Sequence, residues 1–163
     1  MRLTQYCDRT LLLLLRTFVD IIALRKGPEH IPRSWFLLGL ATASMLFASW
    51  CVVLLVPPEQ RDYGLSVVVN ALAMVYYGLV LLITGYSRRT MQTLTAILGC
   101  GAILTAVFFV EIALLGPLLG EKFAGLVALV IIFWSVPVEG HIIARAIDRH
   151  WFVGIAIAIA AFV

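Results

Sequence analysis

Four polar side chains interrupt otherwise apolar stretches of the sequence, and they are the only candidates for chemistry there. Glu111 and Glu139 can bind or release a proton, His141 can hold a proton or a metal ion, and Asn70 can donate and accept hydrogen bonds. Ionisable residues in such stretches are rare and often functional. The two glutamates could form a proton or ion path, or they could be neutral or paired and fix helix packing. We favour packing, because neither glutamate lies at the middle of its stretch and no chain of acids connects them.

The spacing of these residues argues against an active site. Glu139 and His141 are two residues apart, so on a helix they point in nearly opposite directions. They are therefore not a paired acid and base, and they do not have the i, i+4 spacing of helical metal ligands. The three cysteines include no CxxC pair. We predict no catalytic residue, no cofactor and no metal site.

Two contacts of the polar residues can be anticipated from their depth in the stretches. Asn70 and Glu111 are expected at a similar depth, where a hydrogen bond can join them. Glu139 is expected to face the neighbouring hairpin and one of its polar residues, which are Arg88, Arg89 and Gln92.

The composition places these residues in membrane helices. Of the 163 residues, 63% are hydrophobic and only 13% are charged, whereas soluble domains are usually about 45–50% apolar and about 25% charged. A chain of this composition cannot cover its apolar residues with polar ones. A water-soluble enzyme, a disordered tail and a coiled coil are thereby excluded. We predict an all-α polytopic membrane protein.

Long uncharged runs predict the membrane spans. Crossing the hydrocarbon core takes roughly 20 helical residues. The residues from 35 onward form the predicted transmembrane domain, 35–163. It comprises four full spans and a fifth, partial or truncated one, because 13 helical residues reach only about 20 Å. The expected ranges are about 35–56, 64–86, 91–115, 123–145 and 151–163.

The first 34 residues form a separate amphipathic segment. A helix is predicted from about Arg9 to Lys26, and Gly27 and Pro28 are well placed to end it. Such a helix lies in the membrane interface, with basic side chains toward lipid phosphates. Alternatively, its apolar face docks on a partner protein, and both can hold together. The side chains expected to face lipid or a partner are Arg9, Arg16, Arg25 and Lys26.

The distribution of basic residues predicts the orientation. With a cytoplasmic N-terminus, ten of the 12 lysines and arginines lie on the cytoplasmic side and two, Arg61 and Lys122, on the other. Cytoplasmic loops carry such an excess of basic residues. The positive charge therefore serves topology, and we expect neither a nucleic-acid partner nor a soluble substrate.

Three stretches, RKGPEHIPRSW, RRTMQTLTAILGCGA and EGHIIARAID, together resemble small bacterial multi-span inner-membrane proteins that are loosely Yip1-like. The resemblance implies a bacterial inner-membrane location and a partner-binding or accessory role. We therefore expect a non-catalytic accessory, scaffold or assembly subunit of a larger membrane complex, with membrane lipids and other membrane subunits as partners. The alternative is a small oligomeric transporter or channel-like protein that uses Glu111 and Glu139. A membrane enzyme ranks third.

Overall fold

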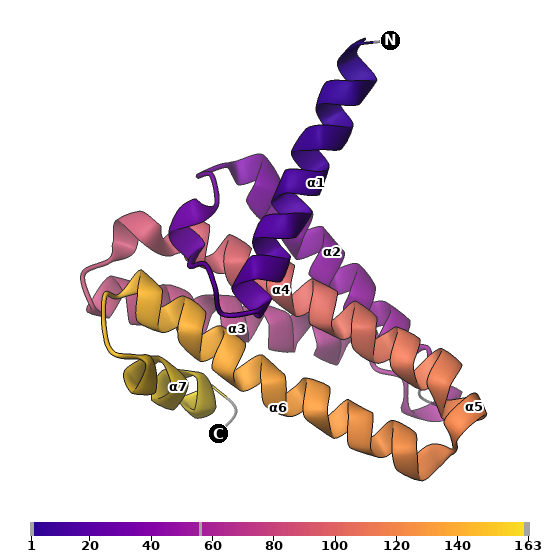
Figure 1. Ribbon diagram of the computed structural model, residues 1–163. Coiled ribbons are helices and arrows are strands. Elements are labelled where there is room, and N and C mark those ends of the chain that lie inside the picture. The colour runs from indigo at the N-terminus through magenta and orange to yellow at the C-terminus, as the bar shows by residue number, and fades with distance from the viewer. Residues whose placement is uncertain (1, 56, 162–163) are drawn as a thin grey trace.

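A computed structural model describes residues 2–55 and 57–161, and within them it describes no side chains for residues 2–11, 115, 119 and 121. The described chain is helical throughout its regular structure (Figure 1). Its α-helices are α1 (Arg2–Ile22), α2 (Trp35–Val53), α3 (Tyr63–Ile83), α4 (Thr90–Val110), α5 (Gly116–Leu119), α6 (Glu121–Ala146) and α7 (Trp151–Ala160). The short turns η1 (Pro28–His30), η2 (Pro58–Gln60) and η3 (Ser87–Arg89) are 3₁₀-helical, and η4 (Glu111–Leu115) is π-helical.

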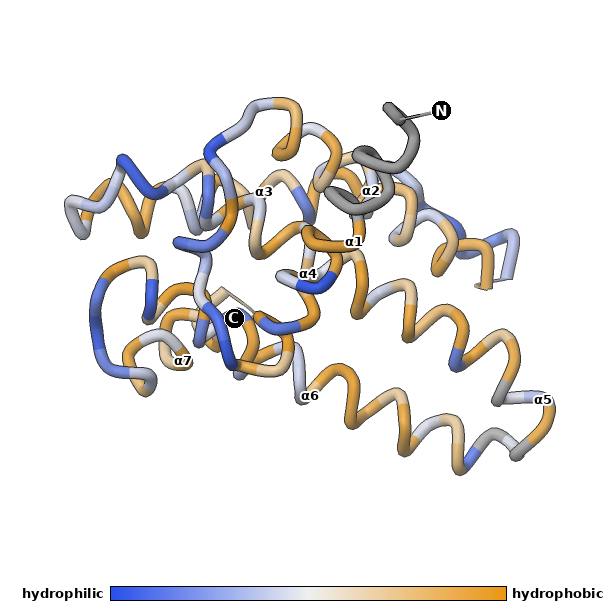
Figure 2. Tube along the Cα trace, turned by 45° about the horizontal axis from the view of Figure 1, so that its top comes forward, coloured by the Kyte–Doolittle hydropathy of each residue, from blue (hydrophilic) through white to orange (hydrophobic). Residues whose placement is uncertain are grey.

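Four of these segments are long and apolar enough to cross a membrane. They are Trp35–Val53, Tyr63–Ile83, Ser87–Leu118 and Lys122–Ala146. The prediction of an all-α protein with four apolar, membrane-length helices is confirmed at this level. Figure 2 shows long hydrophobic stretches along α4 and α6, with hydrophilic residues chiefly in the connections. This pattern is that of a membrane protein, because the connections must stay in water while the helices face lipid.

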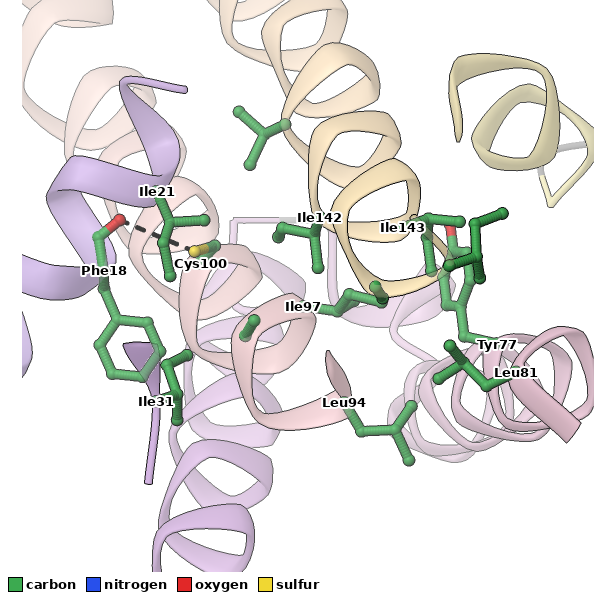
Figure 3. Close-up of a cluster of buried hydrophobic side chains, with 14 of the residues drawn as sticks. Phe18, Ile21, Ile31, Tyr77, Leu81, Leu94, Ile97, Cys100, Ile142 and Ile143 are labelled. Atoms are coloured by element: carbon green, nitrogen blue, oxygen red, sulfur yellow. Dashed lines mark hydrogen bonds between the residues drawn. The ribbon is translucent and has the colours of Figure 1, made fainter. Parts of the chain in front are cut away.

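Helix α4 lies at the centre of the bundle. It packs against α1, α2, α3 and α6, and residues 93–100 are all buried. Small residues allow this close packing, as they commonly do between membrane helices. A Cβ atom on Gly101 would lie 3.3 Å from Sδ of Met45 on α2. Figure 3 shows the resulting core, in which Ile97 and Cys100 of α4 meet side chains of α1, α3 and α6.

The predicted fifth span corresponds to α7, which has 10 residues and is about 15 Å long. It folds back beside the C-terminal part of α6 (Figure 1). The two helices touch through glycines: a Cβ atom on Gly154 would overlap the carbonyl oxygen of Gly140. The backbones are therefore in direct contact. Residues 162–163 of the predicted span lie outside the described residues.

Helix α1 ends earlier than the sequence suggests. Its last residue is Ile22 rather than Lys26, and Leu24 takes the left-handed conformation (φ +59°) that was expected of a glycine. The amide of Arg25 donates to the carbonyl of Asp20 (2.9 Å) and that of Leu24 to the carbonyl of Ile21 (2.8 Å). This is the Schellman arrangement of a helix C-terminus. A leucine in this conformation is strained, and Leu24 packs against the hydrophobic core, which offsets that strain.

Candidate functional site

Glu139 of α6 binds a tyrosine. The hydroxyl of Tyr77 on α3 donates to Oε2 of Glu139 over 2.5 Å, and Tyr77 is 2% exposed. Glu139 does face the neighbouring hairpin of α3 and α4, but the partner there is Tyr77 and not Arg88, Arg89 or Gln92, because the contact is made by α3 inside the bundle. Gln92 instead donates to the carbonyl of Ile31 (2.6 Å). The Tyr77–Glu139 hydrogen bond joins α3 to α6. The carboxyl of Glu139 has no ion-pair partner among the described residues.

The sequence alone did not identify Tyr77 as the partner of Glu139. The sequence gives only a weak signal for this pairing, because any tyrosine on the inner face of a span has a hydroxyl that can donate to Glu139. The neighbouring Tyr76 packs edge-on against Tyr77, with ring centroids 5.1 Å apart, and donates to the carbonyl of Ile157 on α7 (2.9 Å). Two adjacent tyrosines of α3 therefore bind α6 and α7.

Glu111 is the first residue of the π-helical turn η4 and is 3% exposed. Neither of its carboxyl oxygens has a hydrogen-bond partner among the described residues. The predicted bond to Asn70 is wrong: Asn70 donates to the carbonyl of Ser66 in its own helix (2.8 Å) and to Ser49 on α2 (3.4 Å). A buried polar group without a partner is rare, and π-helical turns are frequent at functional sites. Glu111 is therefore the most unusual polar group in the described part of the bundle.

His141 faces away from Glu139, as predicted from their spacing. Its Nε2 atom lies 3.1 Å from the carbonyl oxygen of Lys26, just beyond α1, so this nitrogen is the donor. Glu139 faces α3 instead. Among the described residues, no three histidine, cysteine or acidic side chains lie close enough together to hold a metal ion.

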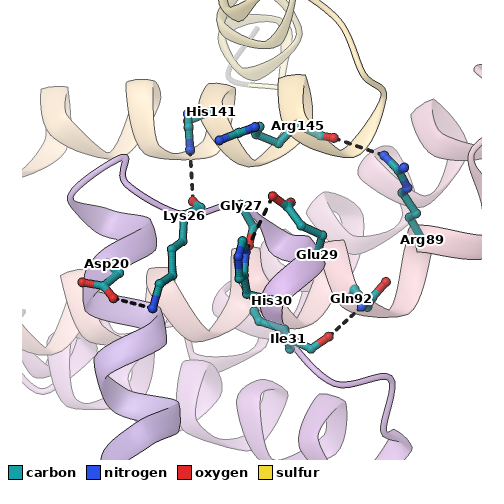
Figure 4. Close-up of polar contacts among 10 residues, drawn as sticks. All are labelled: Asp20, Lys26, Gly27, Glu29, His30, Ile31, Arg89, Gln92, His141 and Arg145. Atoms are coloured by element: carbon teal, nitrogen blue, oxygen red, sulfur yellow. Dashed lines mark hydrogen bonds and ion pairs between the residues drawn. The ribbon is translucent and has the colours of Figure 1, made fainter.

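The end of α1 is held by side chains from two spans. The last carbonyls of a helix have no partner within the helix. Trp134 of α6 donates through its indole nitrogen to the carbonyl of Ile22 (3.2 Å), and His141 donates to that of Lys26 (Figure 4). The thiol of Cys100 on α4 lies 3.8 Å from the carbonyl of Phe18. The C-terminal half of α1 is therefore docked between α4 and α6.

The predicted lipid- or partner-facing residues of α1 differ in their surroundings. Arg16 and Arg25 are exposed. Lys26 is partly exposed and forms an ion pair with Asp20 (2.7 Å; Figure 4). The hydrogen bond from Lys26 lowers the pKa of the Asp20 carboxyl below its ordinary value. The pair is thus intact at neutral pH and is lost only as the pH falls through that lowered pKa. The side chain of Arg9 lies outside the described residues.

The docked half of α1 leaves an apolar stripe uncovered. Leu12, Leu15 and Val19 lie at i, i+3 and i+7 and are 65%, 52% and 54% exposed. This spacing places them along one side of the helix, next to the exposed Arg16. We call these three residues the α1 stripe.

An apolar groove of about 620 Å³ runs between α1, α2 and α4. Leu15 and Phe18 line it from α1, Ala41 and Cys51 from α2, and Phe109 from α4. The groove is lined almost entirely by hydrocarbon, so it offers room for apolar chains.

Comparisons with protein-family models, with curated proteins and with solved structures each find no match for this chain.

Proposed function

We propose that the protein is a non-catalytic accessory or assembly subunit of a larger membrane complex, and that α1 is its docking element. The observation that carries the proposal is the α1 stripe. Contacts to Trp134, His141 and Cys100 fix the C-terminal half of α1 relative to α4 and α6. The three side chains of the α1 stripe are therefore held in a fixed position on the surface of the bundle.

Three points support this role. An amphipathic helix with anchors at i, i+3 and i+7 is a common way to fill the hydrophobic groove of a partner. Two of the polar contacts in the bundle join neighbouring helices: Tyr77 binds Glu139, and Asn70 joins α2 to α3. The connections between helices are short, so none of them forms a separate domain with an active site.

We place the protein in the bacterial inner membrane with its N-terminus in the cytoplasm. The ten-to-two distribution of basic residues supports this orientation. Reporter fusions after Ser87 and after Gly120 should therefore report opposite sides of the membrane, with the fusion after Ser87 in the cytoplasm. A cytoplasmic signal from the fusion after Gly120 would contradict the orientation.

The α1 stripe can be tested by mutation. In the double variant Leu12→Gln, Leu15→Gln, two apolar anchors become polar, and each is worth about 1.5–3 kcal/mol when fully buried. Recovery of the complex after purification in a mild detergent should fall at least about tenfold, while the protein level in the membrane stays unchanged. The bundle does not depend on these two side chains, because both are more than half exposed.

The matched control is Leu13→Gln on the same helix. It makes a similarly exposed leucine polar (63% exposed) outside the α1 stripe, so complex recovery should stay within about twofold of wild type. Equal recovery of the double variant and the wild type would show that the α1 stripe has no part in assembly.

A second candidate function is a small oligomeric transporter or channel-like protein. One observation favours it: Glu111 is buried without a hydrogen-bond partner among the described residues and lies in a π-helical turn. A membrane carboxyl that other residues leave unbonded is suited to exchange a proton or a cation. We rank this function second, because Glu139, the other membrane carboxyl, is engaged by Tyr77.

A further inference from the structure

Arg89 joins two connections that are far apart in the sequence. Its guanidinium donates to the carbonyls of Arg145 (3.3 Å) and Ala146 (3.1 Å) at the end of α6, and it forms an ion pair with Asp148 (2.9 Å) in the α6–α7 connection. Figure 4 shows Arg89 of η3 reaching the carbonyl of Arg145. The η3 turn and the α6–α7 connection are thereby fixed side by side at one end of the bundle.

Three other arginines are displayed at this end. Arg88 belongs to η3, Arg145 to the last turn of α6, and Arg149 to the α6–α7 connection, and all three are exposed. None of their guanidinium groups has a hydrogen bond or an ion pair among the described residues. We call these three residues the arginine rim.

Two acidic groups lie near the arginine rim. Asp148 pairs with Arg89, whereas Glu29 of η1 lies 3.6 Å from Nδ1 of His30, a contact that is an ion pair only when the histidine is protonated. Arg16 of α1 and Arg25, just beyond its end, differ from the arginine rim, because the field of both acts on the carboxylate of Asp20. The arginine rim therefore carries three positive charges, and no carboxylate among the described residues forms an ion pair with any of them.

The rim borders apolar surface. Trp151 and Phe152, at the start of α7, are 40% and 69% exposed. Aromatic residues gather at the level of lipid headgroups, where one side is wet and the other apolar. A guanidinium group matches a phosphate through two parallel hydrogen bonds. Positive charge next to an aromatic and apolar border is the combination that a phospholipid with an anionic headgroup requires.

We propose that Arg88, Arg145 and Arg149 form a binding surface for anionic phospholipid headgroups, with Arg89 as the residue that holds its two halves together. The ligand class is a phosphodiester lipid of net negative charge, and its acyl chains follow the apolar surface of the adjoining spans. This surface is distinct from the α1 stripe, and the inference does not depend on the proposed assembly role.

The test measures lipid binding to the purified full chain by native mass spectrometry, with phosphatidylglycerol titrated against phosphatidylcholine. The wild type should prefer phosphatidylglycerol, and raising the salt should reduce the preference. Near a membrane each basic residue contributes about 1 kcal/mol, which is about fivefold. The variant Arg88→Gln, Arg145→Gln, Arg149→Gln should therefore bind phosphatidylglycerol about 100-fold more weakly, whereas the corresponding triple lysine variant should keep most of the affinity.

The matched control is Arg61→Gln, Lys122→Gln, which removes positive charge from the connections at the opposite end of the bundle. It should change the affinity by less than about threefold. If the two glutamine variants lose the same affinity for phosphatidylglycerol, the effect depends on net charge alone and the proposal is overturned. A wild type that does not prefer phosphatidylglycerol would also overturn it. Displacement of the lipid by millimolar inorganic phosphate would identify a site for free anions and overturn the assignment to lipid. Unchanged unfolding temperatures of the two variants exclude misfolding as the cause.

Discussion

Replacing Gly154 by alanine should detach α7 from α6. The added Cβ atom would overlap the carbonyl oxygen of Gly140 and lie 2.8 Å from the backbone nitrogen of Ala144. These are backbone atoms of a long helix, and they cannot move aside as a flexible side chain can. Overpacking a core typically costs about 1–3 kcal/mol and occasionally more. We expect a loss of about 3 kcal/mol or more, measured by thermal or denaturant unfolding in a mild detergent.

The control for this substitution is Gly125→Ala on α6. A Cβ atom at Gly125 meets no atom within 4 Å, and alanine is the better helix former by about 0.8–1.0 kcal/mol. This variant should therefore be as stable as the wild type or slightly more so. A Gly154→Ala protein that unfolds within about 1 kcal/mol of the wild type would show that the two helices are not in backbone contact.

The sequence was sufficient to predict the helices because each one follows from a local property. An uncharged run such as Trp35–Val53 has to satisfy its backbone groups internally in lipid, and only a helix does so within a single segment. The opposite directions of Glu139 and His141 follow from helical geometry alone. These predictions needed no knowledge of which helices are neighbours.

The contacts could not be predicted, because they depend on how the helices pack. Glu139 binds Tyr77 because α3 lies beside α6, and the sequence does not specify that order. The end of α1 differs from the prediction for a related reason. Leu24 adopts the left-handed conformation that usually requires glycine, and tertiary contacts of its neighbours offset the strain, so the helix ends before the predicted Gly27. The π-helical turn at Glu111 has no recognisable sequence signal.

The two membrane carboxyls should tolerate loss of charge. Glutamine at position 139 keeps an oxygen that can accept the hydrogen bond from Tyr77, so Glu139→Gln should assemble normally. Glu139→Ala removes that acceptor and leaves a buried hydroxyl unpaired, at a cost of about 1–3 kcal/mol in addition to the cavity. Glu111 has no partner to lose among the described residues, so Glu111→Leu should raise the free energy of unfolding by about 1–3 kcal/mol. Denaturant unfolding and complex recovery in mild detergent measure both effects.

The same variants separate the two candidate functions. A proton or ion path needs a group that can change its charge, whereas packing needs only shape and a hydrogen bond. A Glu139→Gln or Glu111→Gln protein that is present at the normal level and folded but inactive in the cell would contradict the assembly role. It would identify that glutamate as the functional residue.

The assembly role is tested most directly by the composition of the wild-type protein purified from its native membrane in a mild detergent. The particle's mass and protein content should be determined together. We expect a stoichiometric complex with a larger membrane protein, and we expect the Leu12→Gln, Leu15→Gln variant to lose that partner. A particle that contains only copies of this chain, arranged around a polar cavity that includes Glu111, would contradict the assembly role and favour transport.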